Sequence, residues 1–565
     1  MILLDPYASR SCPVKIQHEF DPLRTTAPDD EGLRESFTGG KLFETQVLDE
    51  ICAARPDLVT DLRNSGLGTA ERELATRVAV ERGDWVIIGP TVPIDPVGHR
   101  RGHPDVLVRD ADRPDGRPGY LPVECKRHLV LEQGSAEHRG HFSRLSEPLR
   151  SASIEVAERS FRSSRDYDLM QMAHYWRLLE AAGWSAPGDP TAGVIGTDLV
   201  PGVGSPVIAW VSLTAKLIRT FSRTSELGWK RRGGLERYDH EHNFRVKVAT
   251  QVSRRTGAPD DPPLMVNPVV VPECASCQWW ELCRVQLNDD DLSLRISKSP
   301  LDVREINVLR TRGVHTIHDL AGADIDALLV DYLPEVRHRH GAEGRLRLAA
   351  RRANLMLTGR ELDRLTDGPI DVPEASLEID FDIETSRSDQ VYLWGFLVHD
   401  RTSVEPPRYV SFARFDDLSR ADEIALAHEA MGWLADLVAE RPDAAVYHYS
   451  DYEILHIGKL LGRQPGSLGA RLLDRQDLFV DMFTLVRDNF FGANGLGLKV
   501  VAHTGAGFEW RDANPGGLNS QLWFDDAVRA GSEQERNEAR ERVLAYNEDD
   551  VRATHALRAW LRTLS

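Results

Sequence analysis

A stretch near residue 380, in which acidic and apolar side chains alternate, constrains the fold more than any other segment. In LEIDFDIETS, Asp380, Asp382 and Glu384 are separated from one another by single apolar residues. Successive side chains of a β-strand point to opposite faces of a sheet, so the acids share one face and the apolar residues the other. Carboxylates held side by side repel one another unless cations neutralise them. The segment therefore predicts a strand with one buried face and a cation site on the other.

Two later segments carry the side chains expected to complete this site. The C-terminal stretch ERVLAYNEDDVRATHALRAWL has a helical pattern, with Tyr546 and Asp550 four residues apart and so on one face. Upstream of it, DAAVYHYSDYEILHIGKLL predicts a strand that ends near Tyr449, followed by a helix that carries Glu453. QVYLWGFLV predicts the hairpin partner of the acidic strand.

A D-x-E pair on a first strand with Y-x-x-x-D on a last helix resembles the DnaQ-like, DEDD-type 3′→5′ exonucleases of the RNase H fold. The resemblance implies that Asp382, Glu384 and Asp550 hold two divalent ions, Mg²⁺ or Mn²⁺, which clamp the attacking and leaving oxygens. It also implies that Tyr546 helps to position the attacking water.

The middle motif departs from this family, in which an Asp follows an Asn. The best match here is Glu453 in SDYEIL, with Asp451 and Asp481 as alternatives. The resemblance implies that Glu453 is a further metal ligand. An RNase H-like domain that only binds nucleic acid is the alternative that this departure leaves open.

A second set of charged residues lies in the N-terminal half. HPDVLVRDADRPDGRPGYLPVECKRHLV predicts two strands joined by a polar loop rich in Gly and Pro. Asp105 precedes the first apolar run, and Glu124 and Lys126 close the second strand on the same face. Carboxylates bind Mg²⁺ through oxygen, and a lysine beside the ion can orient or deprotonate water. The pattern predicts a site for phosphodiester hydrolysis, with an ordinary charged surface hairpin as the alternative.

Two flanking helical segments add to this set. DLMQMAHYWRLLEAAG carries Gln171 and Tyr175 on one face, and GGKLFETQVLDEICAA places Glu44 after a Gly pair. In this order the motifs resemble the RecB-like branch of the PD-(D/E)xK nucleases, although many relatives have His where Glu44 stands. The resemblance implies three metal ligands, one catalytic lysine and two accessory catalytic residues, which are Glu44, Asp105 and Glu124, then Lys126, then Gln171 and Tyr175.

Three of the six cysteines fall within ten residues, as Cys274-x2-Cys277-x5-Cys283, with no second C-x-x-C pair to complete a zinc ribbon. Cys12, far upstream, is the candidate for a fourth thiolate. One N-terminal and three C-terminal cysteines around a RecB-like core resemble the iron–sulfur nucleases. The resemblance implies a 4Fe–4S cluster on four thiolates. A zinc ion on the same cysteines, or unligated thiols, are the alternatives.

Composition limits the classes of function. The chain has 565 residues, with 69 basic against 88 acidic, a net charge of −19. This balance excludes a uniformly basic nucleic-acid binder but not an enzyme with local basic surface. No apolar run approaches the length of a membrane span. The start, MILLDPYASR, lacks a basic leader, so a cytoplasmic protein is expected.

Breaks in the pattern near residues 290 and 366 predict an α/β multidomain chain. Residues 1–290 are expected to form a restriction-endonuclease-like RecB nuclease core with the iron–sulfur cluster. Residues 291–365 are expected to form a small helical connector similar to a helix-hairpin-helix unit, and 366–565 an RNase H-like DEDD-type exonuclease domain.

Two segments are locally basic. Residues 216–247 hold nine Lys and Arg against four acids, with Trp229, Tyr238 and Phe244 interleaved, a mixture that suits single-stranded nucleic acid. Residues 337–360 hold seven Arg against one acid, which favours a phosphate track. Solvated helix faces are the ordinary alternative for both.

These patterns predict a metal-dependent DNA nuclease with two active sites, acting on single-stranded or frayed DNA. The family resemblance alone implies a role in repair or recombination. It also implies a helicase as a partner, which the sequence does not identify. One rival is a nucleic-acid-binding scaffold with degenerate sites. The other is an RNA-directed nuclease, because these motifs grip phosphate and do not reveal the sugar.

Overall fold

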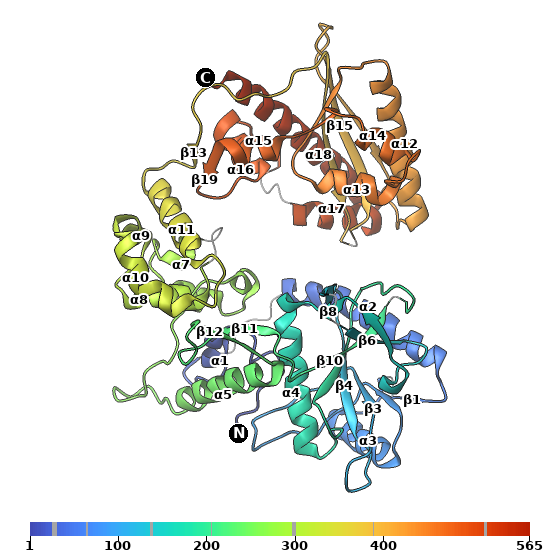
Figure 1. Cartoon of the computed structure of the whole chain (residues 1–565), viewed down its shortest axis with the longest axis vertical. Coiled ribbons are helices and arrows are strands. Elements are labelled where there is room, and N and C mark those ends of the chain that lie inside the picture. Colours follow the sequence, from blue (N-terminus) through green and yellow to red (C-terminus); the bar gives the residue numbers. More distant parts are fainter. Residues whose placement is uncertain are drawn as a thin grey trace. The chain divides into compact units, whose positions relative to one another are not determined.

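The computed structural model describes residues 1–24, 31–63, 66–135, 139–204, 206–296, 301–387, 389–512 and 517–565. It divides into two compact units, shown in Figure 1. The first unit contains Met1–Arg295, Leu301–Thr316 and Ala323–Leu346, and the second contains Ile317–Gly322 and Arg347–Ser565. Residues of the predicted connector are thus divided between the two units.

An eight-stranded mixed sheet forms the centre of the first unit as described. Its strands, in spatial order, are β1 (Val59–Asp61), β2 (Val86–Ile88), β3 (Val106–Arg109), β4 (Tyr120–Cys125), β9 (Thr191–Ile195), β10 (Val207–Ser212), β6 (Arg139–Arg144) and β7 (Ile154–Ala157). Strands β3 and β4 are antiparallel, and β4 and β9 are parallel. The middle strands are continuous apolar runs because they are buried on both faces.

Helices of the first unit pack against this sheet and also form a smaller second core. The helices are α1 (Pro13–Glu19), α2 (Glu31–Ala54), α3 (Thr69–Arg82), α4 (Asp166–Ala182), α5 (Gly234–Val252), α6 (Trp280–Arg284), α7 (Leu292–Arg295), α8 (Val303–Thr311) and α10 (Ile325–Val336). Helices α2, α3 and α4 contribute to the same core as the sheet, whereas α1 packs on α5 in a smaller one. Two short antiparallel pairs complete the unit, β5 (Leu131–Gln133) with β8 (Arg159–Phe161) and β11 (Ile218–Phe221) with β12 (Trp229–Arg232).

The second unit is built on a five-stranded sheet among its described residues. The strand order is β16 (Arg408–Ala413), β15 (Val391–Asp400), β14 (Leu377–Thr385), β17 (Ala445–His448) and β18 (Phe479–Asp481). Strands β14 to β16 are antiparallel, and β14, β17 and β18 run parallel. The hairpin expected from LEIDFDIETS and QVYLWGFLV is therefore present.

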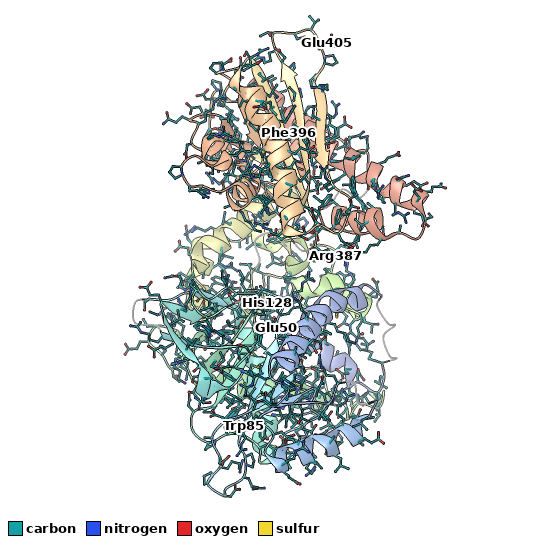
Figure 2. The ribbon with its side chains drawn as sticks, turned by 90° about the vertical axis from the view of Figure 1, so that its right-hand side faces the viewer. Glu50, Trp85, His128, Arg387, Phe396 and Glu405 are labelled. Atoms are coloured by element: carbon teal, nitrogen blue, oxygen red, sulfur yellow. The ribbon has the colours of Figure 1, made fainter. Side chains whose placement is uncertain are left out.

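Helices cover both faces of this sheet (Figure 1). The unit contains the helices α9 (Ile317–Gly322), α11 (Ala342–Leu357, which begins in the first unit), α12 (Arg420–Ala439), α13 (Tyr452–Leu461), α14 (Leu468–Leu473), α15 (Met482–Asn489), α16 (Leu498–Ala506), α17 (Gly517–Arg529) and α18 (Glu533–Thr563). A short pair, β13 (Leu362–Arg364) with β19 (Phe490–Gly492), lies beside the sheet. The apolar face of β14 packs with α12 and α13 around Phe396, labelled in Figure 2. Ser532 begins α18 with a capping box, satisfying its first backbone N–H groups.

A buried group of ions joins the acidic face of β14 to α18. Arg558 donates to both oxygens of Asp380, at 3.2 and 2.9 Å, and also to Glu378. Arg562 donates to Glu378 at 2.8 Å, and His555 lies 3.2 Å from Asp380. Asp380 is therefore committed to an ion pair, although its strand position had grouped it with the expected cation ligands.

No helix in the described parts of the chain combines the length and apolar character needed to cross a membrane.

We expect Arg558→Met to destabilise the second unit by about 3–5 kcal/mol, because it removes the guanidinium that pairs with buried Asp380, while Glu378 keeps only its pairing with Arg562 and Arg401. The measurement is denaturant unfolding followed by a probe in this unit. Arg529→Met is the control, because the Arg529–Asp417 pair is exposed (61% and 74%) and should contribute about 1 kcal/mol or less. Equal losses in the two variants would contradict the prediction.

Candidate active sites

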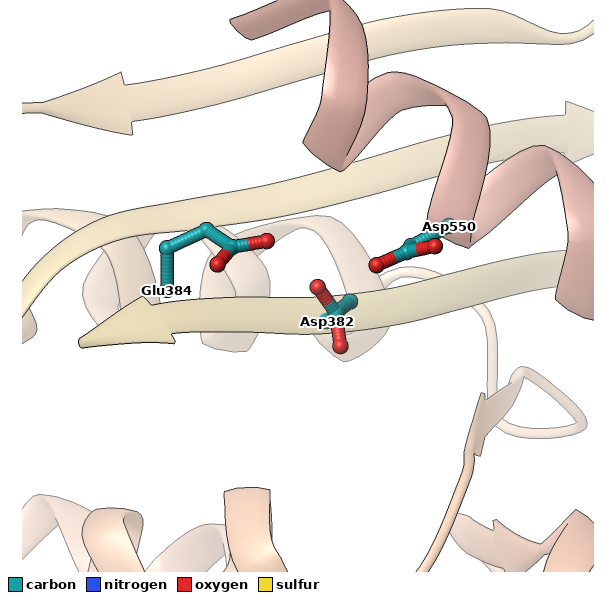
Figure 3. A group of neighbouring side chains, drawn as sticks. All are labelled: Asp382, Glu384 and Asp550. Carbon is teal, nitrogen blue, oxygen red and sulfur yellow. The ribbon is translucent and has the colours of Figure 1, made fainter. Parts of the chain in front are cut away.

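Three carboxylates meet where α18 crosses β14 in the second unit. Asp382 and Glu384 project from β14, and Asp550 projects toward them from α18 (Figure 3). One oxygen from each lies within 4.8 Å of the others, and within the described chain this is the one group of three such side chains so close. Glu384 and Asp550 are buried and Asp382 is partly exposed, so the group opens to solvent at Asp382.

The electrostatics of this cluster favour a bound cation. Burial raises the pKa of Asp382 well above its ordinary value, and the charges of Glu384 and Asp550 raise it further. Burial and Asp550 raise the pKa of Glu384 to about 8. Burial likewise raises the pKa of Asp550. Carboxylate oxygens are the ligands that Mg²⁺ and Mn²⁺ prefer, so the donor set fits a divalent ion that would relieve this repulsion.

Neutral donors fix the orientation of each carboxylate. Asn547 donates to Asp382 at 2.8 Å, Ser520 donates to Glu384 at 2.8 Å, and Trp510 donates to Asp550 at 2.7 Å. No sequence pattern pointed to Ser520 or Trp510. Asn547 could have been noticed, because it lies one turn before Asp550 on the same helix.

Gly395 on β15 makes room for this support. It pairs with Asp382 across the sheet, and a Cβ atom at this position would lie only 1.7 Å from Oδ1 of Asn547. Any larger residue would displace Asn547, and with it the hydrogen bond to Asp382.

Glu453, in the first turn of α13, interacts with the same site through its charge. Its side chain is buried, and Oε2 has no hydrogen-bond partner in the described structure. Burial, reinforced by Asp481, Asp451 and Glu384, raises the pKa of Glu453 to about 8. Asp481 is instead engaged in capping α15, where it accepts from the backbone N–H of Phe483 at 2.9 Å. Glu453 is thus more available to a cation than Asp481.

A lysine that the sequence patterns did not single out lies beside Asp550. Lys499, on α16, donates to the hydroxyl of Tyr546 at 2.6 Å, and its Nζ is 3.6 Å from Oδ2 of Asp550. Burial raises the pKa of Tyr546, and Asp550 and Glu384 add to the effect, so this hydroxyl stays protonated. The hydroxyl and the ammonium group lie together at the edge of the acidic cluster.

The charged residues expected on β3 and β4 also meet in the first unit. The backbone N–H of Cys125 donates to Asp105 at 2.7 Å, which holds Asp105 against the end of β4. Gln171 donates to Glu124 at 2.5 Å and accepts from Lys126 at 2.9 Å. Gln171 also donates to the hydroxyl of Tyr175 at 3.2 Å. Five of the six predicted residues are therefore connected by hydrogen bonds or by adjacent strands.

Glu44, the sixth residue, reaches this group from α2 through its charge. Burial raises the pKa of Asp105 well above its ordinary value, and Glu124 and Glu44 raise it further. Burial and Glu124 also raise the pKa of Glu44. Burial raises the pKa of Glu124, whose Oε2 has no partner in the described residues. These carboxylates do not converge as tightly as those of the second unit, but their oxygen donors also fit a divalent cation.

The four cysteines expected to act together line one cavity. Cys12, Cys274, Cys277 and Cys283 contribute to its wall, with Trp279 and Trp280. Glu273 accepts the backbone N–H of Cys12 at 3.0 Å, which ties the N-terminal segment to the C-terminal cysteines. Burial raises the pKa of Cys12 and of Cys274, and that of Cys283 to about 12. Four thiols facing one cavity fit a thiophilic metal or cluster. Cys52 and Cys125 instead pack against the sheet core.

The basic segments are less open to nucleic acid than their composition indicates. Tyr238 is fully buried, so the expectation that it stacks on bases is wrong. The guanidinium of Arg219 lies 4.0 Å from the ring centre of Trp229 and covers one face of this ring.

In the arginine-rich segment, four of the seven arginines pair with carboxylates. Within the first unit Arg339 and Arg345 pair with Glu305, and within the second Arg351 and Arg360 pair with Asp363. These four guanidinium groups share two carboxylates, so their positive charge is partly neutralised.

A family model of the RNase H superfamily matches residues 379–562. The match spans β14, which carries Asp382 and Glu384, and most of α18, which carries Asp550. The chain is thus a mixed α/β multidomain protein with an RNase H-like C-terminal domain, which indicates a nuclease-type hydrolase with nucleic acid as its substrate. Comparison with curated proteins and with solved structures yields no match.

We expect the affinity of the second-unit cluster for Mn²⁺ to rise with pH and to level off above about pH 8, because the ion displaces protons from Glu384 and Glu453. The raised pKa values also imply that the metal-free unit loses stability as pH rises from about 5 to 8, since the folded carboxyls hold protons that the unfolded ones release. Titration calorimetry at several pH values, in an Asp105→Asn background that weakens the first site, measures the affinity. Adding Asp382→Asn should remove the binding, and affinity independent of pH would contradict the prediction.

Proposed function

We propose that the protein is a metal-dependent DNA nuclease with two active sites, one in each unit. The convergence of Asp382, Glu384 and Asp550 on one point, within a segment that matches the RNase H superfamily, is the observation that carries the proposal. Such a buried acidic group is costly without cations, and divalent ions beside a phosphodiester supply the chemistry of hydrolysis.

The proposed second site is a 3′→5′ exonuclease. Asp382, Glu384, Asp550 and Glu453 would hold two Mg²⁺ or Mn²⁺ ions, which stabilise the attacking and leaving oxygens when bound. Tyr546 keeps its proton and accepts a hydrogen bond from Lys499, so the pair is fixed at the edge of the carboxylates. There the Tyr546 hydroxyl can donate to the attacking water and hold it in line with the phosphate.

The proposed first site cuts by the single-lysine arrangement of the RecB-like nucleases. Asp105, Glu124 and Glu44 would hold the metal. Burial lowers the pKa of Lys126, but the charges of Glu124, Tyr7 and Asp168 together outweigh this effect and the pKa of Lys126 is raised. Lys126 therefore acts as a cation that orients water and stabilises developing negative charge, with Gln171 fixing its position relative to Glu124.

The proposal assigns a 4Fe–4S cluster to Cys12, Cys274, Cys277 and Cys283. Their shared cavity and the absence of a disulfide among the described cysteines support this assignment. A cluster here would join the two ends of the sequence that forms the first unit. Zinc on the same four cysteines is the alternative that metal analysis decides.

Single-stranded DNA is the proposed substrate. The proposed role in repair or recombination and the proposed helicase partner rest on the sequence resemblance alone. Cleavage of RNA of the same sequence at an equal rate would extend the proposed substrate to RNA. Binding without cleavage at either site would favour a nucleic-acid-binding scaffold.

We expect Lys126→Ala to remove one cleavage activity on labelled single-stranded DNA with Mn²⁺ and Asp382→Ala to remove the other. Because the two sets of carboxylates belong to different units, each loss should be at least about 100-fold and independent. Mapping of product ends separates the activities, and Glu405→Ala, an exposed loop carboxylate labelled in Figure 2, is the control. If either single change abolishes all cleavage, the protein does not have two independent sites.

We expect anaerobically purified protein to be brown, with iron and sulfide in stoichiometric amount, and Cys277→Ala to bleach it because one of four thiolates is lost. Visible absorption and metal analysis are the measurements. Cys52→Ser is the matched control, because Cys52 lies outside the cavity and should leave the colour intact. Colourless protein with stoichiometric zinc would contradict the cluster assignment.

A further inference from the structure

The first residues of the chain form a strap that is fixed at both ends. At one end, Leu4 exchanges backbone hydrogen bonds with the segment around Arg100, donating to His99 at 2.9 Å and accepting from Arg101 at 3.0 Å. At the other end, Arg245 donates to the carbonyl of Ser11 at 2.9 Å, next to the Cys12 contact with Glu273. The turn between these anchors, residues 5–10, is therefore held in place.

Asp5 shapes this turn. It accepts the backbone N–H groups of Tyr7 at 2.7 Å and Ala8 at 3.0 Å, and the N–H of Arg10 donates to the carbonyl of Tyr7 at 3.1 Å. The guanidinium of Arg10 then lies over the Tyr7 ring, 4.3 Å from its centre. Stacking on an aromatic ring fixes the plane of the guanidinium without using its N–H donors.

Arg10 is an arginine with unused donors. Only 20% of its side chain is exposed, and its guanidinium makes no hydrogen bond to any described residue. Its nearest carboxylate is Asp168, at 3.8 Å, which is beyond hydrogen-bond distance. Oδ2 of Asp168 is taken by His128, labelled in Figure 2, at 2.8 Å. None of its nitrogens is among the buried atoms that lack a partner, so its five N–H donors can be reached from solvent and are free to bind a ligand.

Arg10 faces the proposed first active site. Asp168 is on α4, one turn before Gln171, the residue that bridges Lys126 and Glu124. The backbone N–H of His128 donates to the carbonyl of Lys126 at 2.7 Å. The charge of Arg10 is also felt there. It is close enough to Glu124 and to Lys126 to interact electrostatically with both side chains.

We propose that Arg10 binds the phosphate of the nucleic-acid strand at the first site, with its guanidinium donating to non-bridging oxygens. The inference rests on the proposed nuclease function and adds to it a residue outside the four RecB-like motifs. The planar fork of arginine matches two phosphate oxygens, and its charge stabilises the extra negative charge that builds up during hydrolysis. The strap explains how residue 10 is brought to a site built from residues 105–175.

The test uses full-length protein with Asp382→Asn, so that cleavage reports on the first site alone. In this background we expect Arg10→Gln to lower kcat/KM on labelled single-stranded DNA about 100-fold, mostly through kcat. Arg10→Lys should recover only part of it, because a lysine keeps the charge but not the fork. Binding of the same DNA, measured by anisotropy with Ca²⁺ in place of Mn²⁺, should weaken, and its salt dependence should fall by about 0.7 in slope.

Arg113→Gln is the matched control. Arg113 has nearly the same exposure, 24%, and the same 3.8 Å distance to an aspartate, but it lies in the loop at the far end of the β3–β4 hairpin. Equal kcat/KM and equal DNA affinity in the Arg10→Gln and Arg113→Gln proteins would overturn the inference. So would a loss of cleavage matched by an equal loss of Mn²⁺ affinity, because Arg10 would then act only on the carboxylates.

Failure of the nuclease proposal has a different signature. If the Asp382→Asn protein has no cleavage that Lys126→Ala removes, the first site is not a nuclease. The anisotropy measurement still decides Arg10 in that case, since weaker binding in Arg10→Gln supports a phosphate contact and unchanged binding overturns it.

Discussion

Buried carboxylates that face one another are the constraint on which the second unit depends. Asp382, Glu384 and Asp550 cannot all be ionised in a site of low polarity without positive charge, and their raised pKa values express that conflict. The fold nevertheless holds these three carboxylates together, and it neutralises the neighbouring acids, Asp380 and Glu378, with arginines. Asp380, on the same strand, is neutralised by Arg558, which fixes α18 to β14 and so sets where Asp550 meets the strand. One buried ion pair thereby positions a second group that needs metal.

The first unit solves a similar problem with a different arrangement. Lys126 lies among its carboxylates, held by Gln171, and supplies part of the compensating charge, as Lys499 does beside Asp550 in the second unit. Arg10 adds a second cation from a segment that the cysteine cavity helps to hold. The cysteine cavity and the acidic group of the first unit are therefore connected through the short backbone segment between Arg10 and Cys12.

The sequence predicted these sites best where their residues are regularly spaced along one strand or helix. The strand pair around Asp382 followed from alternation, because a period of two has one structural meaning over such a length. Asp105 and Glu124 were brought together by neighbouring strands, as their positions indicated. The role of Asp380 could not be predicted, since periodicity gives the face of a strand but not the identity of what covers it. Tyr238 was misjudged for the same reason, because its burial depends on packing from distant segments.

The sequence by itself determined the local patterns, namely the acidic strand, the helix with Tyr546 and Asp550, the E-x-K strand and the cysteine spacing. These depend on residues close together in the chain, where strand and helix periods place side chains on a face. Only the tertiary structure decided which acids are neutralised by arginine, that Lys499 and Asn547 support the carboxylates, and that Arg10 reaches the first site. Those contacts join residues far apart in sequence, and they exist because the core and the sheet register fix distances that no local pattern encodes.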